Sequence, residues 1–537
     1  MSRSKPFWRQ RLFLAVLVLL PWTAAAQPAT VVVDSTSSAI DGNTAGIASL
    51  AISPGYDGVI SLMEAIAAAN NTPGPKRIVF SPALRGKTIP FGSNDIADLL
   101  RFGLESSDLT LDGDVDGDGV ADVTLDASGR TFATLRVRAS NITIQHLVFR
   151  EFGGQAINFA CGDVACVPRT IANVHITGNV FDSQRGGAVE IGVLGILGSA
   201  NNPLLSDFTF SDIVIDGNTV RGPLQTFADG IGARACSDGV FRNRFSRVRI
   251  ANNHLSIHTA IDASAADEAL PPSYSDRCVL EDLVIDGNVI EDAQTGIYLD
   301  SANLGNQNNV AQRITITNNR LLRPRTGMRI GAANLPDPTR ATSFNVMSDL
   351  LVSGNEIADA ERAVIIAAGN WPLADVAPTA VDDNTLSGVR FIGNDIHGYR
   401  FTGLQVYGAV GASSSGAHTS SRNRLDGLTI TGNRFETSAG GFPAGVEIVG
   451  GQSNGTAAAS NEILRVTIAG NVFRGNSPAL SVIGGRRPGA TGNRVSIEAM
   501  SPNTFEGNAQ DLFVAVDTEG AVGNRIEITS KRRGAAH

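Results

Sequence analysis

Charged and hydrogen-bonding side chains recur at one position of a strand pattern that returns along the chain. In copies such as Gly296-Ile297-Tyr298-Leu299 and Gly327-Met328-Arg329-Ile330, every second residue should point away from the core. Aligned on the Gly-Ile position, these outward residues are Glu190, Gly232, Asp262, Tyr298, Arg329, Ile365, Gln405, Glu447 and Ser481. Just before the same strands stand Asp229, His258, Arg325, Arg362 and Arg400. Residues one copy apart would lie about 5 Å from each other, so the copies would form one polar ribbon.

This ribbon predicts binding of an extended polymer that carries carboxylates or sulfates. Arginine binds planar anions through two parallel hydrogen bonds, so three flanking arginines are candidate substrate-binding residues, namely Arg325, Arg362 and Arg400. At the acidic end, a second set of candidates could bind the polymer through a bridging calcium ion: Glu190, Asp229 and Asp262.

β-Elimination from a uronate needs three groups: a cation on the carboxylate, a base for the C5 proton and an acid for the leaving oxygen. No lysine stands between Lys87 and Lys531, which excludes a lysine base from the repeats. His258 and Tyr298 are a candidate catalytic pair.

Two other functions compete with elimination. An inverting hydrolase needs two carboxylates roughly 6.5 to 9.5 Å apart, which Asp229 could form with Asp262 or Glu190. A non-catalytic surface or adhesin-type protein would only display variable loops, such as the Gly- and Ser-rich residues 411 to 421.

The strands belong to a repeat whose clearest copy runs from Leu425 to Phe435. Its spacing varies between about 31 and 39 residues, a range typical of solenoids. Each copy has an apolar/polar alternation, a Gly-Asn or Asn-Asn corner and an apolar residue two positions later. The corner asparagines are Asn179, Asn218, Asn253, Asn288, Asn319, Asn355, Asn394, Asn433 and Asn471, with a looser copy at Asn503.

Two short strands and a corner cannot bury their own apolar face, so each copy must stack on its neighbours. We therefore predict an all-β fold, a right-handed parallel β-helix of about ten coils over residues 131 to 515, with the corner asparagines in a hydrogen-bonded ladder. Residues 516 to 537 would form the C-terminal end and a basic tail.

The first 26 residues predict an export signal. Basic residues precede an apolar run from Leu12 to Leu20, and Ala24-Ala25-Ala26 offers a cleavage site. We expect a secreted or periplasmic protein that is a monomer and has no membrane span in its mature chain. Loss of four basic signal residues changes the formal charge from −9 to about −13, which argues against nucleic acid as a partner.

The four cysteines fit an oxidising compartment. Cys161 and Cys166 are close enough for a local disulfide, whereas Cys236 and Cys278 lie one repeat apart and could join loops of adjacent coils. Reduced thiols are the alternative.

Residues 27 to 130 do not follow the repeat and predict a cap. Ser61 and Glu64 form a capping box before one short helix, which would cover the open end of the first coil. An acidic stretch then resembles an EF-hand calcium loop, without the usual carboxylate at its last position. We predict structural Ca²⁺ there, held by Asp112, Asp114, Asp116, Asp118 and Asp122.

The cap also carries a family resemblance. Residues Asp57 to Ile66, Ile78 to Ser81 and Gly86 to Ile89 resemble the CSLREA domain found at the start of exported bacterial β-helix proteins. Ile60 and Met63 depart from the motif, where the family has Cys and Arg. The repeats resemble the pectate lyase type of β-helix, which implies an acidic polysaccharide substrate and Arg329 as an alternative base. The motifs of polygalacturonase-like proteins are not found in their usual arrangement, so we expect a polysaccharide lyase.

Overall fold

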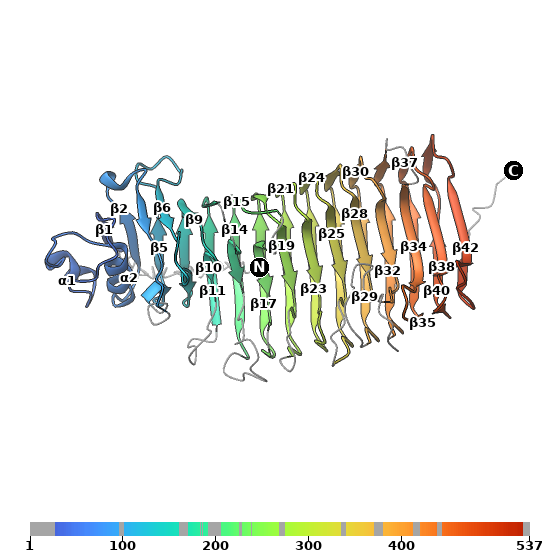
Figure 1. Cartoon of the computed structure of the whole chain (residues 1–537), viewed down its shortest axis with the longest axis horizontal. Helices are drawn as coiled ribbons and strands as arrows, with labels where there is room; N and C mark the ends of the chain where they lie inside the picture. The colour runs from blue at the N-terminus through green and yellow to red at the C-terminus, as the bar shows by residue number, and fades with distance from the viewer. Residues whose placement is uncertain are drawn as a thin grey trace, which may run out of the picture.

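The computed structural model confirms the predicted fold class (Figure 1). The structure describes residues 27–95, 101–159, 170–182, 184, 186–191, 206–224, 228–237, 239–267, 274–334, 340–369, 380–411, 419–437 and 443–529. Over these residues the chain winds into a parallel β-solenoid, with α1 and α2 at one end and β42 at the other. The predicted signal sequence, Cys161, Cys166 and the basic tail lie outside the described residues.

Three parallel sheets run along the solenoid. The first sheet contains β1 (Ala29–Val33), β2 (Lys76–Phe80), β5 (Leu109–Asp112), β8 (Ile142–Gln145), β11 (Thr170–Thr177), β14 (Thr209–Asp216), β17 (Arg244–Ala251), β20 (Val279–Asp286), β23 (Val310–Thr317), β26 (Val346–Ser353), β29 (Thr385–Ile392), β32 (Arg424–Thr431), β36 (Glu462–Ala469), β40 (Arg494–Ala499) and β43 (Arg525–Ile528). The second sheet contains β4 (Gly103–Leu104), β7 (Leu135–Val137), β10 (Ile157–Asn158), β13 (Val189–Ile191), β16 (Asp229–Arg234), β19 (Thr259–Ser264), β22 (Thr295–Asp300), β25 (Thr326–Gly331), β28 (Arg362–Ala367), β31 (Thr402–Tyr407), β34 (Ala444–Gln452), β38 (Leu480–Arg486) and β42 (Leu512–Thr518). The third sheet contains β3 (Thr88–Pro90), β6 (Val123–Asp126), β9 (Leu147–Arg150), β12 (Val180–Asp182), β15 (Thr219–Arg221), β18 (His254–Ser256), β21 (Val289–Glu291), β24 (Arg320–Leu322), β27 (Glu356–Ala358), β30 (Asp395–His397), β33 (Arg434–Glu436), β37 (Val472–Arg474) and β41 (Thr504–Glu506). A small two-stranded sheet joins β35 (Ala458–Ala459) to β39 (Ala490–Thr491).

The predicted asparagine ladder is present at the corner between the first and third sheets. From Asn179 to Asn471, the backbone N–H and the side-chain Nδ2 of each asparagine donate to Oδ1 of the asparagine one coil further on. Asn503 accepts the last of these bonds. The ladder satisfies buried backbone groups at every corner, where no strand partner is available.

A second asparagine ladder, which the sequence analysis missed, stands immediately before the strands of the first sheet. It runs through Asn309, Asn345, Asn384, Asn423, Asn461, Asn493 and Asn524 with the same two donors per rung. Cys278 takes the place of an asparagine one coil earlier, and its backbone N–H donates to Asn309 Oδ1. Its sulfur forms the predicted disulfide with Cys236, with a Cα–Cα distance of 6.1 Å.

Stacked side chains fill the core. The apolar residue two positions after each corner asparagine is buried in every coil from Phe181 to Phe473. Where these residues are aromatic they stack in register, as in Phe435 and Phe473, whose ring centroids lie 5.3 Å apart with planes within 11°.

The N-terminal end is covered by two helices, where we predicted one. α2 (Leu62–Asn70) has the predicted capping box, and Glu64 also accepts hydrogen bonds from the backbone of Asp41 and Gly42. α1 (Ile47–Ile52) packs beside it. The three sheets already include β2 to β6, so the coils begin before the predicted boundary at residue 130. Among the described residues, no helix is long and apolar enough to cross a membrane.

Candidate functional site

The second sheet brings the predicted ribbon together. Each member pairs in register with the next one, in an unbroken file from Glu190 to Ser481. The file extends to Asn158 and Arg136 at one end and to Phe513 at the other. Asp262, Tyr298 and Arg329 therefore stand side by side on β19, β22 and β25. Glu190 takes its predicted place in the backbone register, but its side chain lies outside the described residues.

The flanking residues occupy three different positions of the register, and two of them, Asp229 and Arg362, are the first residues of their strands. Asp229 and Arg362 share the register of Thr259 and Thr326. His258 and Arg325 precede that position by one residue, and Arg400 precedes Thr402 by two. The difference arises because the turn that enters each strand varies in length, whereas the paired strands cannot slip without moving their apolar side chains out of the core.

Much of the ribbon is buried, although we expected it to face solvent. Asp262 is 7% exposed and Ile365 is inaccessible. Ile365 belongs to a small apolar cluster with Ala367, Tyr407 and Val449, separate from the main core. The accessible part of the face lies at the start of the strands, where Arg325 and Arg400 are exposed.

A buried guanidinium that the prediction missed organises the acidic end. Arg234, which ends β16, is 6% exposed. Its Nη2 donates to Asp229 and, at 2.5 Å, to Asp262, and its Nε lies 2.7 Å from Asp267. Arg234 thus forms ion pairs with two of the three carboxylates that we predicted as ligands of a bridging calcium ion.

This arrangement is also unsuited to inverting hydrolysis. In an inverting pair the two carboxyl groups flank the sugar and its attacking water. Here Asp229 and Asp262 share one guanidinium nitrogen, which fills the space between them.

Beside the Arg234 guanidinium, Tyr298 and Asp300 form a hydrogen-bonded pair. Asp300 is fully buried and its Oδ2 lies 2.9 Å from the hydroxyl of Tyr298, which also receives a hydrogen bond from Asn334 Nδ2 at 2.5 Å. Burial, together with the charges of Asp267 and Asp262, raises the pKa of Asp300 well above its usual range. Burial and the neighbouring carboxylates also raise the pKa of Tyr298. Both shifts favour the protonated forms of these groups.

His258 lies between opposite charges. Burial lowers the pKa of His258 from its usual value of 6.5, the Asp229 carboxylate opposes this shift, and the Arg329 guanidinium adds to it. Nδ1 of His258 lies 3.3 Å from the hydroxyl of Thr259. The imidazole is therefore neutral at physiological pH and lies within electrostatic reach of residues from β16 and β25.

Arg329 is mostly buried within a cluster of arginines. Burial lowers the pKa of Arg329, and the charges of Arg325 and Arg362 lower it further. Arg325 is paired with Glu361 at 3.3 Å. The guanidiniums of Arg362 and Arg400 lie 5.0 and 5.2 Å from the centroid of the Phe401 ring. The structure thus brings the predicted arginines together with His258 and Tyr298 on one face.

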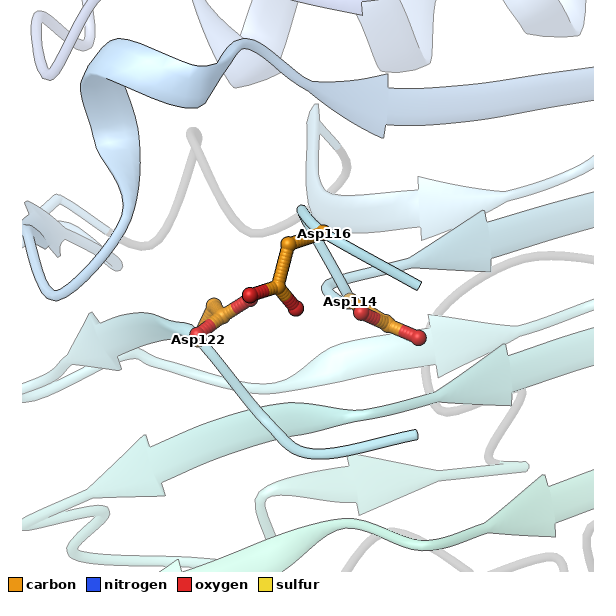
Figure 2. A group of neighbouring side chains, drawn as sticks. All are labelled: Asp114, Asp116 and Asp122. Carbon is orange, nitrogen blue, oxygen red and sulfur yellow. The ribbon is translucent and has the colours of Figure 1, made fainter. Parts of the chain in front are cut away.

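The N-terminal acidic loop places three of the five predicted calcium ligands together. Ligand oxygens of Asp114, Asp116 and Asp122 all lie within 4.8 Å of one another (Figure 2). Asp112 is not available, since its buried carboxylate is bonded to Arg77, Gln145 and His146. Asp118 lies outside the group. Arg85 contacts Asp116 at 2.5 Å and Asp122 at 3.2 Å, so a protein cation already stabilises the loop.

Comparisons with known proteins extend no further than the fold. No protein-family model and no curated protein matches the chain, and the resemblance to the CSLREA domain stays a prediction. Among solved structures, the A-module of mannuronan C-5 epimerase AlgE4 from Azotobacter vinelandii is 13% identical with a TM-score of 0.34, over 84% of this chain and 92% of that one. The Dettilon tailspike protein is 14% identical with a TM-score of 0.34, over 90% and 68%. A family 28 exopolygalacturonase from Yersinia enterocolitica is 10% identical with a TM-score of 0.33, over 86% and 75%. Two of these three are named as polysaccharide-acting enzymes, but likenesses at this level carry no argument about the reaction.

Proposed function

We propose that this protein binds an extended acidic polysaccharide along the second sheet and cleaves it by β-elimination. The observation that carries the proposal is the placement of His258 at the entry of β19, one coil after Asp229 and two coils before Arg329, where both charges act on its imidazole. Removal of a proton next to a carboxylate requires a base and a cation, and here His258 and Arg329 lie two coils apart on the same sheet.

In this proposal His258 removes the C5 proton of a uronate residue. Arg329 binds the uronate carboxylate and stabilises the negative charge that develops on it, which makes the C5 proton more acidic. Asp229 stabilises the imidazolium that forms when His258 accepts the proton. Arg234 holds Asp229 in place from the other side.

Tyr298 supplies the proton to the leaving oxygen. Burial keeps the phenol protonated, and its hydroxyl, which donates to Asp300 Oδ2 in the structure, turns to the leaving oxygen of the bound substrate. The electron pair of the broken C5–H bond forms the C4–C5 double bond, the C4–O bond breaks, and the departing oxygen takes the phenol proton. The product is an unsaturated uronate.

An absorbance assay tests this proposal. The conjugated double bond of the unsaturated product absorbs ultraviolet light, so cleavage of polygalacturonate, alginate or another polyuronate can be followed directly. The wild-type protein should release this product from at least one polyuronate. Equal chain cleavage without ultraviolet absorbance would instead indicate a hydrolase.

We also propose that Asp114, Asp116 and Asp122 bind Ca²⁺ in a structural role. Three converging carboxylates are suitable ligands for Ca²⁺. The ion would compete with Arg85 for Asp116 and Asp122. Calcium should therefore raise the thermal midpoint of the wild-type protein, and Asp116→Asn should reduce that increase, whereas the half-buried control Asp395→Asn on the third sheet should not. The same midpoint with calcium and with a chelator would exclude the site.

Export completes the proposal. The predicted signal sequence and the disulfide between Cys236 and Cys278 support action outside the cytoplasm, where disulfides form. Detection of the mature N-terminus near Gln27 in the secreted or periplasmic fraction tests this point.

A further inference from the structure

Phe401 is an exposed aromatic residue with a cation near its ring on each of two adjacent coils. It stands immediately before β31 and is 42% exposed. The guanidinium of Arg400, its chain neighbour, lies 5.2 Å from the ring centroid, and that of Arg362, at the start of β28, lies 5.0 Å away. Backbone hydrogen bonds from Phe401 to Glu361 and from Ala444 to Phe401 fix the backbone of Phe401 between its neighbouring coils.

The two guanidiniums differ from most arginines of the solenoid in their electrostatic surroundings. Arginines such as Arg323 and Arg422 form close ion pairs with an aspartate one coil away. Arg325, the third predicted substrate-binding arginine, is paired with Glu361. Within the described part of the chain, no carboxylate forms an ion pair with Arg362 or Arg400.

Two like charges without a counter-ion repel each other, and the aromatic ring offsets part of this repulsion. The negative face of an aromatic ring attracts a guanidinium within about 6 Å of its centroid. Phe401 therefore keeps both cations beside one ring without neutralising them. Two such guanidiniums present parallel N–H donors, which suit the oxygens of a carboxylate.

From these contacts we infer that Phe401 is a positioning residue for an anion clamp formed by Arg362 and Arg400. This inference rests on the proposed function and assigns the clamp to a uronate carboxylate that is not the reacting one. The clamp is continuous with the reacting site, since the charge of Arg362 also acts on Arg329 one coil away. Because coils repeat about every 4.8 Å, roughly the length of one sugar residue, successive uronates along the solenoid axis would meet successive coils.

Equilibrium binding to polygalacturonate, dextran sulfate and neutral dextran tests the clamp. His258→Ala is used as the background, so that no polymer is cleaved during the measurement. Phe401→Leu should weaken polygalacturonate binding about three- to tenfold, and Arg362→Gln should weaken it at least as much. Phe401→Tyr keeps the ring and should bind as the background does. Arg390→Gln, which removes an exposed arginine from the first sheet, is the matched control and should leave the affinity unchanged.

Each result decides one point. Unchanged polygalacturonate affinity in Phe401→Leu overturns the clamp, as does an equal loss in Arg390→Gln. A larger effect of Phe401→Leu on dextran sulfate than on polygalacturonate overturns the assignment to a carboxylate. If the clamp variants lose affinity while the wild-type protein yields no unsaturated product, the clamp stands and the proposed elimination fails.

Discussion

Asp262 pairs in register with Tyr298 across β19 and β22, so two residues from different repeats lie side by side on the second sheet. Asp262 in turn accepts a hydrogen bond from the buried Arg234. The candidate site therefore depends on how the coils stack. Each coil supplies one or two polar side chains, and the pairing of parallel strands brings these side chains together. The predictions below test the chemistry of these groups and the ladders that position them.

Replacement of His258 should abolish cleavage with little effect on binding. General-base catalysis contributes about 10²- to 10⁴-fold to a rate, so His258→Ala should lower kcat by about that factor. The Kd for a polyuronate should change less than about threefold, because the arginines remain. His175→Ala is the control, since His175 lies on the first sheet. A wild-type rate in His258→Ala would assign the base to Arg329.

The pH profile should report the lowered pKa of His258. Only the neutral imidazole accepts a proton, so kcat/KM should rise with pH through a pKa below 6.5 and then level off. Because the Asp229 charge raises this pKa, Asp229→Asn should move the acidic limb to still lower pH. Asp395→Asn on the third sheet should leave the limb in place. A limb centred above pH 6.5 in the wild-type protein would contradict this account.

Asp300 should make folding stability depend on pH. Its pKa is raised above the ordinary value of 3.8 in the folded protein, so above pH 3.8 the folded state holds a proton that the unfolded state has lost. The free energy of unfolding should consequently fall as pH rises from about 3.8 toward the raised pKa. Asp300→Asn should flatten this dependence, because the amide does not titrate. Parallel pH curves for the two proteins would refute the buried protonated carboxyl.

An inner rung of the asparagine ladder should matter more than the last one. Asn319 Oδ1 accepts two hydrogen bonds from Asn288, and its Nδ2 donates to Ile285 O and Asn355 Oδ1. Asn319→Ala leaves several buried groups unsatisfied and should cost about 3 kcal/mol in urea unfolding. Asn503→Ala, at the half-buried end of the same ladder, should cost about 1 kcal/mol. Equal losses would mean that the ladder does not act as a continuous structure.

The disulfide between Cys236 and Cys278 should stabilise the coils that carry the site. A link across 42 residues restricts the unfolded chain by an amount worth about 4 kcal/mol in the loop-entropy model. The double variant Cys236→Ser/Cys278→Ser should lose about 2 to 4 kcal/mol. Reductant should destabilise the wild-type protein but not the variant.

The sequence was sufficient to predict the register of the second sheet, because a side-chain period of two and a buried aliphatic file allow only one alignment of copies such as those at Tyr298 and Arg329. The sequence also predicted the hydrogen-bonded ladder of corner asparagines and the capping box of α2. The second ladder was missed, although asparagine directly before each strand of the first sheet, as at Asn345 and Asn384, was a usable signal.

The groups that lie deep in the site could not be predicted in the same way. Arg234 stands two residues after Gly232, so extending the outward register by one step would have placed it on the same face. Its contacts with Asp229, Asp262 and Asp267 depend on side-chain conformations, which the spacing of residues in the sequence does not determine. The same holds for Asp112. Its place in the acidic loop predicts a calcium ligand, but its carboxylate is bonded to Arg77 and His146 instead, and the sequence does not show these contacts.

The release of unsaturated uronate from a polyuronate panel tests the central claim most directly. The wild-type protein should generate ultraviolet-absorbing product from at least one polyuronate, His258→Ala should generate about 100-fold less or lower still, and His175→Ala should match the wild type. Absence of absorbing product with every polyuronate, or undiminished product from His258→Ala, would contradict the proposal that His258 drives elimination on the second sheet.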